Sequence, residues 1–291
     1  MPRPIPDIMA IDTVVNIMTP EALKHRPEDR KQFFVDKMHV DDDTYNGVTL
    51  DQMLKRMDAA GIERGFLVAS RSGPEYIKYC SQIPYELVAD AVKKHPDRFS
   101  GLAGLDPTWL RKGVKEFERA ITDLGFIGAH FYPHWFELPP DHAKWYPFYD
   151  KCVELDVPVQ LQVGQSLVYS PSYPRKSVGR PICLDQVACD FPDLKLIGIH
   201  CGIPWTQEMI AMAWKHKNIH IITDAHSPKY WPQELVHYIN TYGQDKVMFA
   251  SGFPVLGFER TLQDIADLNL RPEPLRKFLR GNTERLYRIR H

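Results

Sequence analysis

Short apolar runs alternate with amphipathic stretches along the whole chain. The apolar runs have the length and composition of buried parallel strands, and they occupy residues 7–17, 65–70, 99–105, 126–131, 158–163, 194–202, 219–224 and 246–250. Helical patterns separate them at residues 49–61, 86–94, 112–124, 145–155, 184–190, 209–216 and 233–241, and further helices close the chain. Eight strands that alternate with helices predict an α/β protein with a single (β/α)8 TIM barrel over residues 1–291, rather than two doubly wound domains.

The apolar run at residues 194–202, LKLIGIHCG, carries a histidine at its end. Active sites of (β/α)8 barrels lie at the C-terminal ends of the strands, where His200 is expected. Because side chains alternate along a strand, Gly198 and His200 should share one face while Cys201 points the other way. The sequence therefore places His200, and not Cys201, in a candidate site.

Composition narrows the class of partner. The formal net charge is −1 and neither half of the chain carries a block of one sign, which argues against a nucleic-acid or membrane surface. The five cysteines lack the close pairing of a zinc ribbon, and the chain shows neither a leader pattern nor an apolar run of membrane-spanning length. We expect a cytoplasmic protein with reduced thiols and a small-molecule substrate.

Several polar segments between the predicted strands are each compatible with more than one role. The connection after the first strand, with Pro20 and Pro27, fits either a lid or a solvated loop. Arg71 stands directly after the second strand, where it meets a substrate carboxylate or simply lies on the surface. The segment 170–181, SPSYPRKSVGRP, fits a pocket rim that meets an anionic substrate, an interface in a homo-oligomer, or a solvated loop.

Six motifs resemble, in order and spacing, the amidohydrolase superfamily. They are IDTVVN, RFSGLAGLDP, VPVQLQVG, FPDLKLIGIHCG, VMFASGFP and GNTERLYRI. They look most like the branch that contains aminocarboxymuconate-semialdehyde decarboxylase and related aromatic-acid decarboxylases and hydrolases. The resemblance implies a TIM barrel and an enzyme that acts on a small carboxylated or aromatic substrate.

The resemblance also implies a divalent-metal site, but the positions that would ligate the metal are changed. The family's opening His-x-His is Val14 and Asn16 here, its fifth-strand histidine is Gln162, and its eighth-strand aspartate is Gly252. Valine and glycine offer no side-chain donor, and neutral amides are weak ligands for zinc or manganese. Even with Asp12, one carboxylate and two amides make a poor site, so we expect no metal cofactor.

The histidine that this branch uses as a general acid or base beside the metal is retained as His200. Asp224 ends the neighbouring strand and should face it, and an aspartate beside an imidazole stabilises the protonated ring. We therefore expect His200 and Asp224 to form the catalytic pair. A histidine satisfied in the core and a helix-capping aspartate are the alternative readings.

Other polar groups are expected at the same end of the barrel. The fourth strand presents alternating polar side chains, and two amides replace the metal ligands of the family at positions where they reach a substrate carbonyl. The expected substrate-binding residues are Asn16, Arg71, His130, Tyr132, His134, Gln162 and His226.

Three hypotheses follow. The favoured one is a metal-independent enzyme that hydrolyses a lactone or ester, or decarboxylates a small aromatic or unsaturated acid, with His200 as general acid or base. Pyrone-dicarboxylate lactonases of the same superfamily resemble such metal-free hydrolases. The alternatives are a non-catalytic small-molecule-binding barrel and a metalloenzyme with relocated ligands, chosen from His130, His134, His200, Asp224 and His226.

Overall fold

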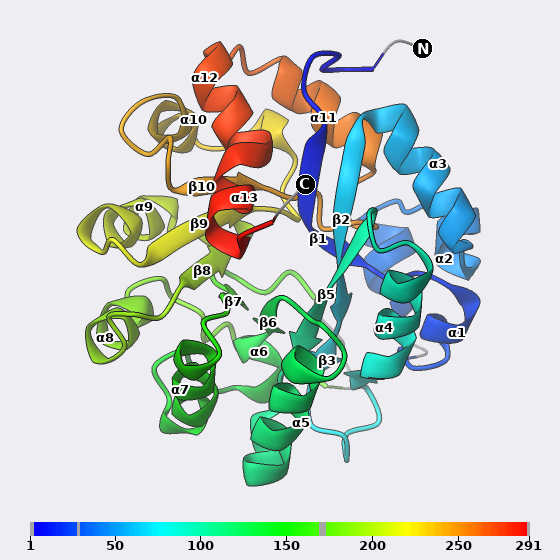
Figure 1. Cartoon of the computed structure of the whole chain (residues 1–291), viewed down its shortest axis with the longest axis vertical. Helices are drawn as coiled ribbons and strands as arrows, with labels where there is room; N and C mark the ends of the chain where they lie inside the picture. The colour runs from blue at the N-terminus through cyan, green and yellow to red at the C-terminus, as the bar shows by residue number, and fades with distance from the viewer. Residues whose placement is uncertain (1–2, 28–29, 169–172, 290–291) are drawn as a thin grey trace.

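The predicted barrel is confirmed. The computed structural model describes residues 3–27, 30–168 and 173–289, and eight parallel strands follow one another in chain order around a closed sheet (Figure 1). They are β1 (Ala10–Asn16), β2 (Ile62–Ala69), β5 (Phe99–Gly104), β6 (Gly128–Phe131), β7 (Val159–Gln162), β8 (Leu196–Ile199), β9 (Ile219–Thr223) and β10 (Val247–Phe249). Residues beyond β10 close the ring, because Gly252 N donates to Val14 O at 3.1 Å and Asn16 N donates to Phe253 O at 2.9 Å.

Helices surround the strands as an outer layer (Figure 1). They are α3 (Leu50–Ala60), α4 (Tyr85–Lys94), α5 (Leu110–Thr122), α7 (Tyr146–Glu154), α8 (Cys183–Asp190), α9 (Thr206–Lys215), α10 (Gln233–Asn240), α11 (Phe258–Ala266), α12 (Pro272–Arg276) and α13 (Asn282–Tyr287). The predicted start of α3 is confirmed, since Thr49 Oγ1 accepts from Gln52 N at 3.2 Å and Thr49 N donates to Gln52 Oε1 at 2.8 Å. Gly61 ends the helix in the left-handed region, at a φ of 88°.

Side chains fill the barrel from the end at which the chain terminates. Tyr287 of α13 inserts there, with its ring 4.9 Å from that of Phe66, and its hydroxyl accepts from Gln160 Nε2 at 2.7 Å. Apolar residues of successive strands, among them Ile197 and Met248, pack around these rings. Described side chains therefore fill the barrel at this end, and the opposite, C-terminal ends of the strands are where barrels of this kind bind ligands.

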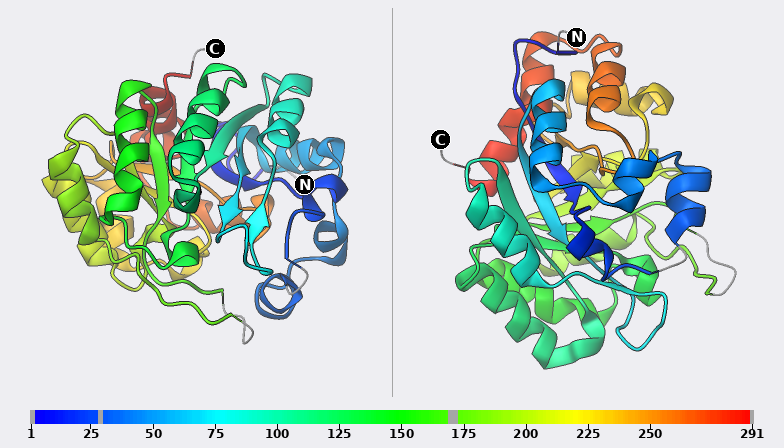
Figure 2. Two further views of the ribbon diagram at one scale, coloured as in Figure 1. Left: turned by 90° about the horizontal axis from the view of Figure 1, so that it is seen from below. Right: turned by 90° about the vertical axis from the view of Figure 1, so that its right-hand side faces the viewer.

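Three connections project from the C-terminal ends of the strands, opposite the end that carries the C-terminus (Figure 2). The first follows β1 and contains α1 (Pro20–Leu23), the π-helix η2 (Gln32–Lys37) and α2 (Asp42–Asn46). The second is the hairpin of β3 (Arg71–Ser72) and β4 (Ser81–Gln82), and the third follows β7. Lys37 Nζ donates to Leu167 O at 2.8 Å, which joins the first connection to the third. We call residues 30–48 and 163–168 together the cover.

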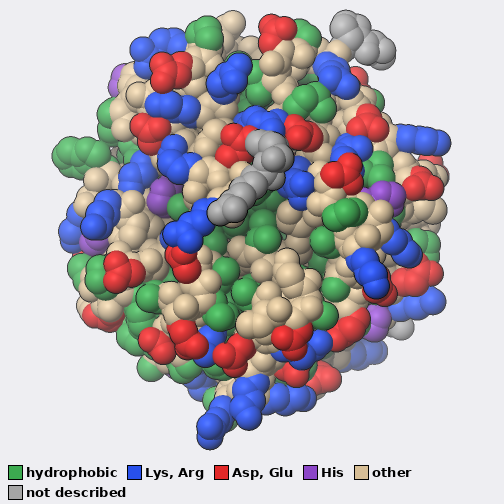
Figure 3. Space-filling view, viewed as in Figure 1, with side chains coloured by type: hydrophobic (Ala, Val, Ile, Leu, Met, Phe, Trp, Pro, Cys, Tyr) green, Lys and Arg blue, Asp and Glu red, His purple; other side chains and the backbone are tan. Residues whose placement is uncertain are grey.

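In the described part of the chain, none of the helices has both the length and the apolar character to cross a lipid bilayer. On the face around α13, acidic and basic side chains are interspersed (Figure 3). That face therefore presents no extended field of one sign, in keeping with a formal net charge of −1.

Candidate active site

A cavity of about 140 Å³ opens at the C-terminal ends of the strands. The strand ends supply its polar side, made of Asn16, Ser70, Tyr132, Gln162, His200, Asp224 and Gly252. The cover and the first turn after β6 supply apolar walls, including Phe33, Phe34, Trp135 and Leu167. Since a protein cavity of roughly 150 Å³ can hold benzene, the space suits one six-membered ring with small substituents.

A left-handed turn, rather than strand alternation, brings His200 into this cavity. β8 ends at Ile199, and His200 and Cys201 follow with φ values of 68° and 56°. Ile199 packs inside the barrel, whereas a Cβ on Gly198 would lie 2.7 Å from Met209 Sδ on the helix side. The prediction that Gly198 and His200 share a face is therefore wrong, although Cys201 does point away into the outer core.

His200 and Asp224 form the expected pair. Asp224 Oδ1 accepts the backbone N–H of His200 at 2.7 Å, and Oδ2 lies 3.3 Å from His200 Nε2. Burial by itself raises the pKa of Asp224, but the charge of His200 and its hydrogen bonds outweigh this effect and hold the pKa below its usual value. The aspartate is thus ionised, and an ionised carboxylate beside an imidazole makes the pair suitable for acid–base chemistry.

Among the described residues, Nδ1 of His200 has no hydrogen-bond partner, and His200 lines the cavity. Asp224 is fully buried and occupied with His200, which argues against the helix-capping reading. Nε2 of His200 therefore faces Asp224, and Nδ1 is available to a ligand in the cavity.

The four positions that resemble the family's ligand positions converge on the cavity. Val14, Asn16, Gln162 and Gly252 all line it. Asn16 Nδ2 donates to Phe253 O at 2.8 Å, so this side chain helps to hold the first strand against the residues that follow the last one. The pairing of β1 with β2 shifts between residues 12 and 15, and the nearby Asp12 turns to Ser251 instead of facing the cavity. This donor set does not fit a divalent ion.

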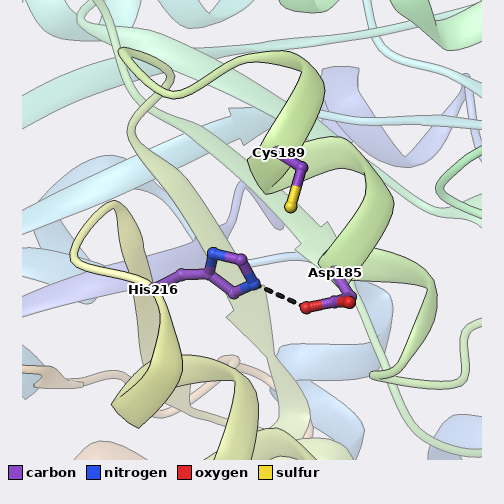
Figure 4. Close-up of side chains that lie close together, drawn as sticks. All are labelled: Asp185, Cys189 and His216. Atoms are coloured by element: carbon purple, nitrogen blue, oxygen red, sulfur yellow. Dashed lines mark hydrogen bonds and ion pairs between the residues drawn. The ribbon is translucent and has the colours of Figure 1, made fainter.

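Within residues 3–27, 30–168 and 173–289, one group of three His, Cys, Asp or Glu side chains has donor atoms close enough to share a metal, and it lies outside the barrel. It consists of Asp185, Cys189 and His216, whose ligand atoms are all within 4.8 Å of one another (Figure 4). Asp185 Oδ1 lies 2.6 Å from both His216 Nε2 and Lys215 Nζ. These ion pairs fasten α8 to the end of α9.

The relocated ligands do not assemble, because the fourth-strand histidines are used elsewhere. His130 Nδ1 lies 2.8 Å from Gln160 Oε1 in the network beneath the cavity. His134 Nδ1 accepts the backbone N–H of Val178 at 2.9 Å and so holds the connection after β7. Burial lowers the pKa of each histidine to about 4, so both rings are neutral. Neither is among the residues that line the cavity, and their predicted role in substrate binding stays a prediction.

Arg71 and His226 are also placed away from the cavity lining. The guanidinium of Arg71 is buried between two rings, 4.4 Å from the centroid of Tyr85 and 4.1 Å from that of Trp109. His226 is half-buried, with its ring 6.3 Å from that of His200, and desolvation lowers its pKa to about 4. Asn16, Tyr132 and Gln162 are the predicted binding residues that the structure brings together.

The sequence did not reveal two of the basic residues of the cavity, Arg26 and Arg30. Arg26 and Arg30 line it from the connection after β1, and Arg175 lines it from the segment after β7. Arg175 belongs to the segment 170–181, for which contact with an anionic substrate was one of the predicted roles; residues 169–172 lie outside the described residues. Two arginines four residues apart, followed by Phe33-Phe34, were the available signal for a cover rather than a solvated loop.

Comparison with known proteins confirms the resemblance to amidohydrolases. The Amidohydrolase family model matches residues 24–289. The gamma-resorcylate decarboxylase of Polaromonas sp. (strain JS666 / ATCC BAA-500) is 21% identical over 82% of this chain and 87% of its own length. A shorter match, 36% identical, joins 28% of this chain to 26% of the 2-keto-4-carboxy-3-hexenedioate hydratase of Sphingobium sp. (strain NBRC 103272 / SYK-6). The chain thus spans about a quarter of that hydratase.

Solved structures share the fold. An uncharacterised TIM-barrel protein from Bordetella bronchiseptica superposes with a TM-score of 0.77 at 22% identity, over 96% of this chain and 98% of that one. The 5-carboxyvanillate decarboxylase of Novosphingobium aromaticivorans, complexed with manganese and 4-hydroxy-3-methoxy-5-nitrobenzoic acid, gives 0.73 at 17% identity over 97% of each chain. At sequence identities this low, the structural similarity shows a shared fold and nothing about activity.

Proposed function

Because the chain belongs to the amidohydrolase family, we propose that it is an enzyme that decarboxylates a small aromatic or unsaturated carboxylic acid, with His200 as general acid and without a divalent metal. The observation that carries the proposal is the His200–Asp224 pair facing a ring-sized cavity. Relatives named as aromatic-acid decarboxylases support the substrate class.

The pair supplies what this reaction needs. Protonated His200 donates its proton to the ring or alkene carbon that bears the carboxylate. The bond between that carbon and the carboxyl carbon then breaks, its electron pair returns to the substrate, and carbon dioxide leaves. Asp224 stabilises the imidazolium of His200 before the transfer, and the neutral imidazole of His200 regains a proton from water afterwards.

The cavity walls favour the same step. Phe33, Phe34 and Leu167 surround the space with apolar surface, and the cover shields it from bulk water. An apolar, shielded site disfavours the charged carboxylate relative to neutral carbon dioxide and leaves His200 as the proton source. The side chains of Gln162 and Tyr132 are placed to orient a hydroxyl or carbonyl of the substrate.

Hydrolysis of an activated lactone or ester is a second candidate. The Gln162 amide opens into the cavity and, among the described residues, has no hydrogen-bond partner. An amide N–H so placed can stabilise the oxygen of an acyl group under attack, with neutral His200 activating the water. Product analysis separates the two reactions, because only decarboxylation releases carbon dioxide.

The test of His200 is His200→Asn, since asparagine tolerates the positive φ of this position. Release of carbon dioxide from a panel that includes 2,6-dihydroxybenzoate and 5-carboxyvanillate should fall by roughly 10²- to 10⁴-fold in kcat. His39→Asn is the matched control, because His39 also has a positive φ, of 55°, but is exposed and outside this cavity.

Equal turnover in His200→Asn would remove His200 from the mechanism. If acids of the panel stabilise the native protein against heat but no product forms from any of them, the binding-barrel hypothesis replaces the proposed enzyme.

Metal independence is tested by elemental analysis of tag-free Cys189→Ser protein, because the outer Asp185, Cys189 and His216 group is a possible source of adventitious metal. We expect less than about a tenth of an equivalent of zinc or manganese, and turnover unchanged by a chelator. One equivalent of metal, lost together with turnover on chelation, would overturn this part of the proposal.

A further inference from the structure

Arg26 is a half-buried cation with an incomplete set of partners. Its Nη2 reaches Asn16 Oδ1 and Ile17 O only at 3.4 Å, and its buried Nε has no hydrogen-bond partner among the described residues. Burial, with a contribution from the charge of Arg30, lowers the pKa of Arg26 to about 10. The guanidinium is therefore still charged at neutral pH, in a place where charge is disfavoured.

Arg30, four residues further along the chain, repeats the pattern. Its guanidinium lies 4.9 Å from the centroid of the Tyr45 ring, and Nη2 meets Tyr45 O at 3.5 Å. Its Nε is likewise buried and without a hydrogen-bond partner among the described residues. In the described parts of the chain, neither Arg26 nor Arg30 has an ion pair with a carboxylate.

Among the described residues that line the cavity, positive charge therefore exceeds negative charge. The one lining carboxylate, within the described residues, is Asp224, and that group is already paired with His200. Cations buried against apolar walls are costly unless an anion meets them, which points to an anionic ligand.

The leaving carboxylate is a poor candidate for that anion. Decarboxylation turns a charged group into neutral carbon dioxide, so an ion pair with arginine would stabilise the reactant more than the transition state. An anionic group that the substrate keeps throughout the reaction meets no such objection, and it would fix the ring relative to His200.

We propose that Arg26 and Arg30 bind a second carboxylate that the substrate retains, so that the enzyme acts on dicarboxylic acids in preference to monocarboxylic acids. This inference rests on the proposed function, because it assigns one carboxylate to the reaction and the other to the arginines. Arginine suits the role, since its planar fork matches the geometry of a carboxylate.

Calorimetric titration with two ligands of one ring size tests the proposal: benzoate and benzene-1,3-dicarboxylate. The native protein should bind the dicarboxylate roughly ten- to hundredfold more tightly, as expected for a charge-assisted hydrogen-bond pair. Arg26→Met and Arg30→Met should each lose most of that preference. His200→Asn should keep the preference.

Lys24→Met is the matched control, because Lys24 is an exposed cation of the same connection that does not line the cavity. Equal affinity of the native protein for the two ligands would overturn the proposal. So would a preference that survives in both arginine variants. Arg30→Met keeps the test valid if Arg26→Met fails to fold.

The failure of this inference is distinguishable from that of the proposed reaction. If the dicarboxylate preference depends on the arginines but no acid releases carbon dioxide, the anion site stands and the decarboxylase proposal fails. If monocarboxylic acids are decarboxylated and no preference exists, the reaction stands and the dicarboxylate proposal fails.

Discussion

Asp12 provides a quantitative test of how the closing edge of the barrel is held together. Its carboxylate is completely buried where β1 meets the residues after β10. It accepts the Ser251 hydroxyl, the Ser251 N–H at 3.1 Å and the Val14 N–H at 3.2 Å. Burial raises its pKa, these hydrogen bonds lower it, and the result is a pKa of about 7 against an ordinary value of 3.8.

The sign of the effect on stability follows from these two values. Between pH 3.8 and about 7 the folded protein keeps a proton on Asp12 that the unfolded chain has released. Asp12 therefore contributes its full stabilisation below the unfolded-state pKa of 3.8, and this stabilisation is lost as the pH rises through the folded-state pKa of about 7. The contribution is about 3 kcal/mol at pH 5 and close to zero at pH 8.

Asp12→Asn removes this titration and keeps a side chain of the same size. Urea unfolding at pH 5, 6, 7 and 8 gives the free energy of unfolding for both proteins. The native value minus the variant value should fall by about 3 kcal/mol from pH 5 to pH 8. Asp51→Asn, at an exposed position of α3, is the control. A difference that stays constant with pH would refute the reasoning, because it would mean that the hydrogen bonds keep Asp12 ionised throughout.

Three further outcomes concern the site. Asp224→Asn should lower kcat roughly 10- to 100-fold in steady-state assays, because the imidazolium of His200 loses its counter-charge; equal kcat would remove the pair from the mechanism. Gly252→Ala should destabilise the fold by about 1–2 kcal/mol in urea, because its φ is +68° and the new Cβ would lie 3.1 Å from a backbone nitrogen after β9. Lys37→Met should raise KM by up to roughly tenfold with little change in kcat, since the bond to Leu167 O is lost from the cover; unchanged KM would show that this bond does not help to hold the cover.

The fold was accessible from the sequence because its signals are local. Each strand is a short apolar run, and each helix has an amphipathic pattern with recognisable ends, as at Thr49 and Gly61. The proximity of His200 and Asp224 was predictable for the same reason. The C-terminal ends of neighbouring parallel strands meet at one edge, so residues just beyond β8 and β9 must lie close together.

The remaining site residues were less accessible, because polar side chains near strand ends have several possible partners. His134 and Arg71 stand at positions as suitable for substrate as Tyr132, but a backbone amide and two aromatic rings occupy them. Arg26 and Arg30 lie in a connection whose path depends on contacts with distant segments, such as Lys37 with Leu167. Local periodicity contains no information on such contacts.

The left-handed backbone at residue 200 limits which amino acids can replace the histidine. A φ of 68° is tolerated by glycine, asparagine and aspartate, but it is strongly unfavourable for valine, isoleucine and threonine. In a library randomised at this codon, β-branched variants will be lost through poor folding before chemistry is selected. The informative comparison is therefore between histidine and the residues that share its backbone preference. Folded variants that lack the histidine should carry glycine, asparagine or aspartate at position 200.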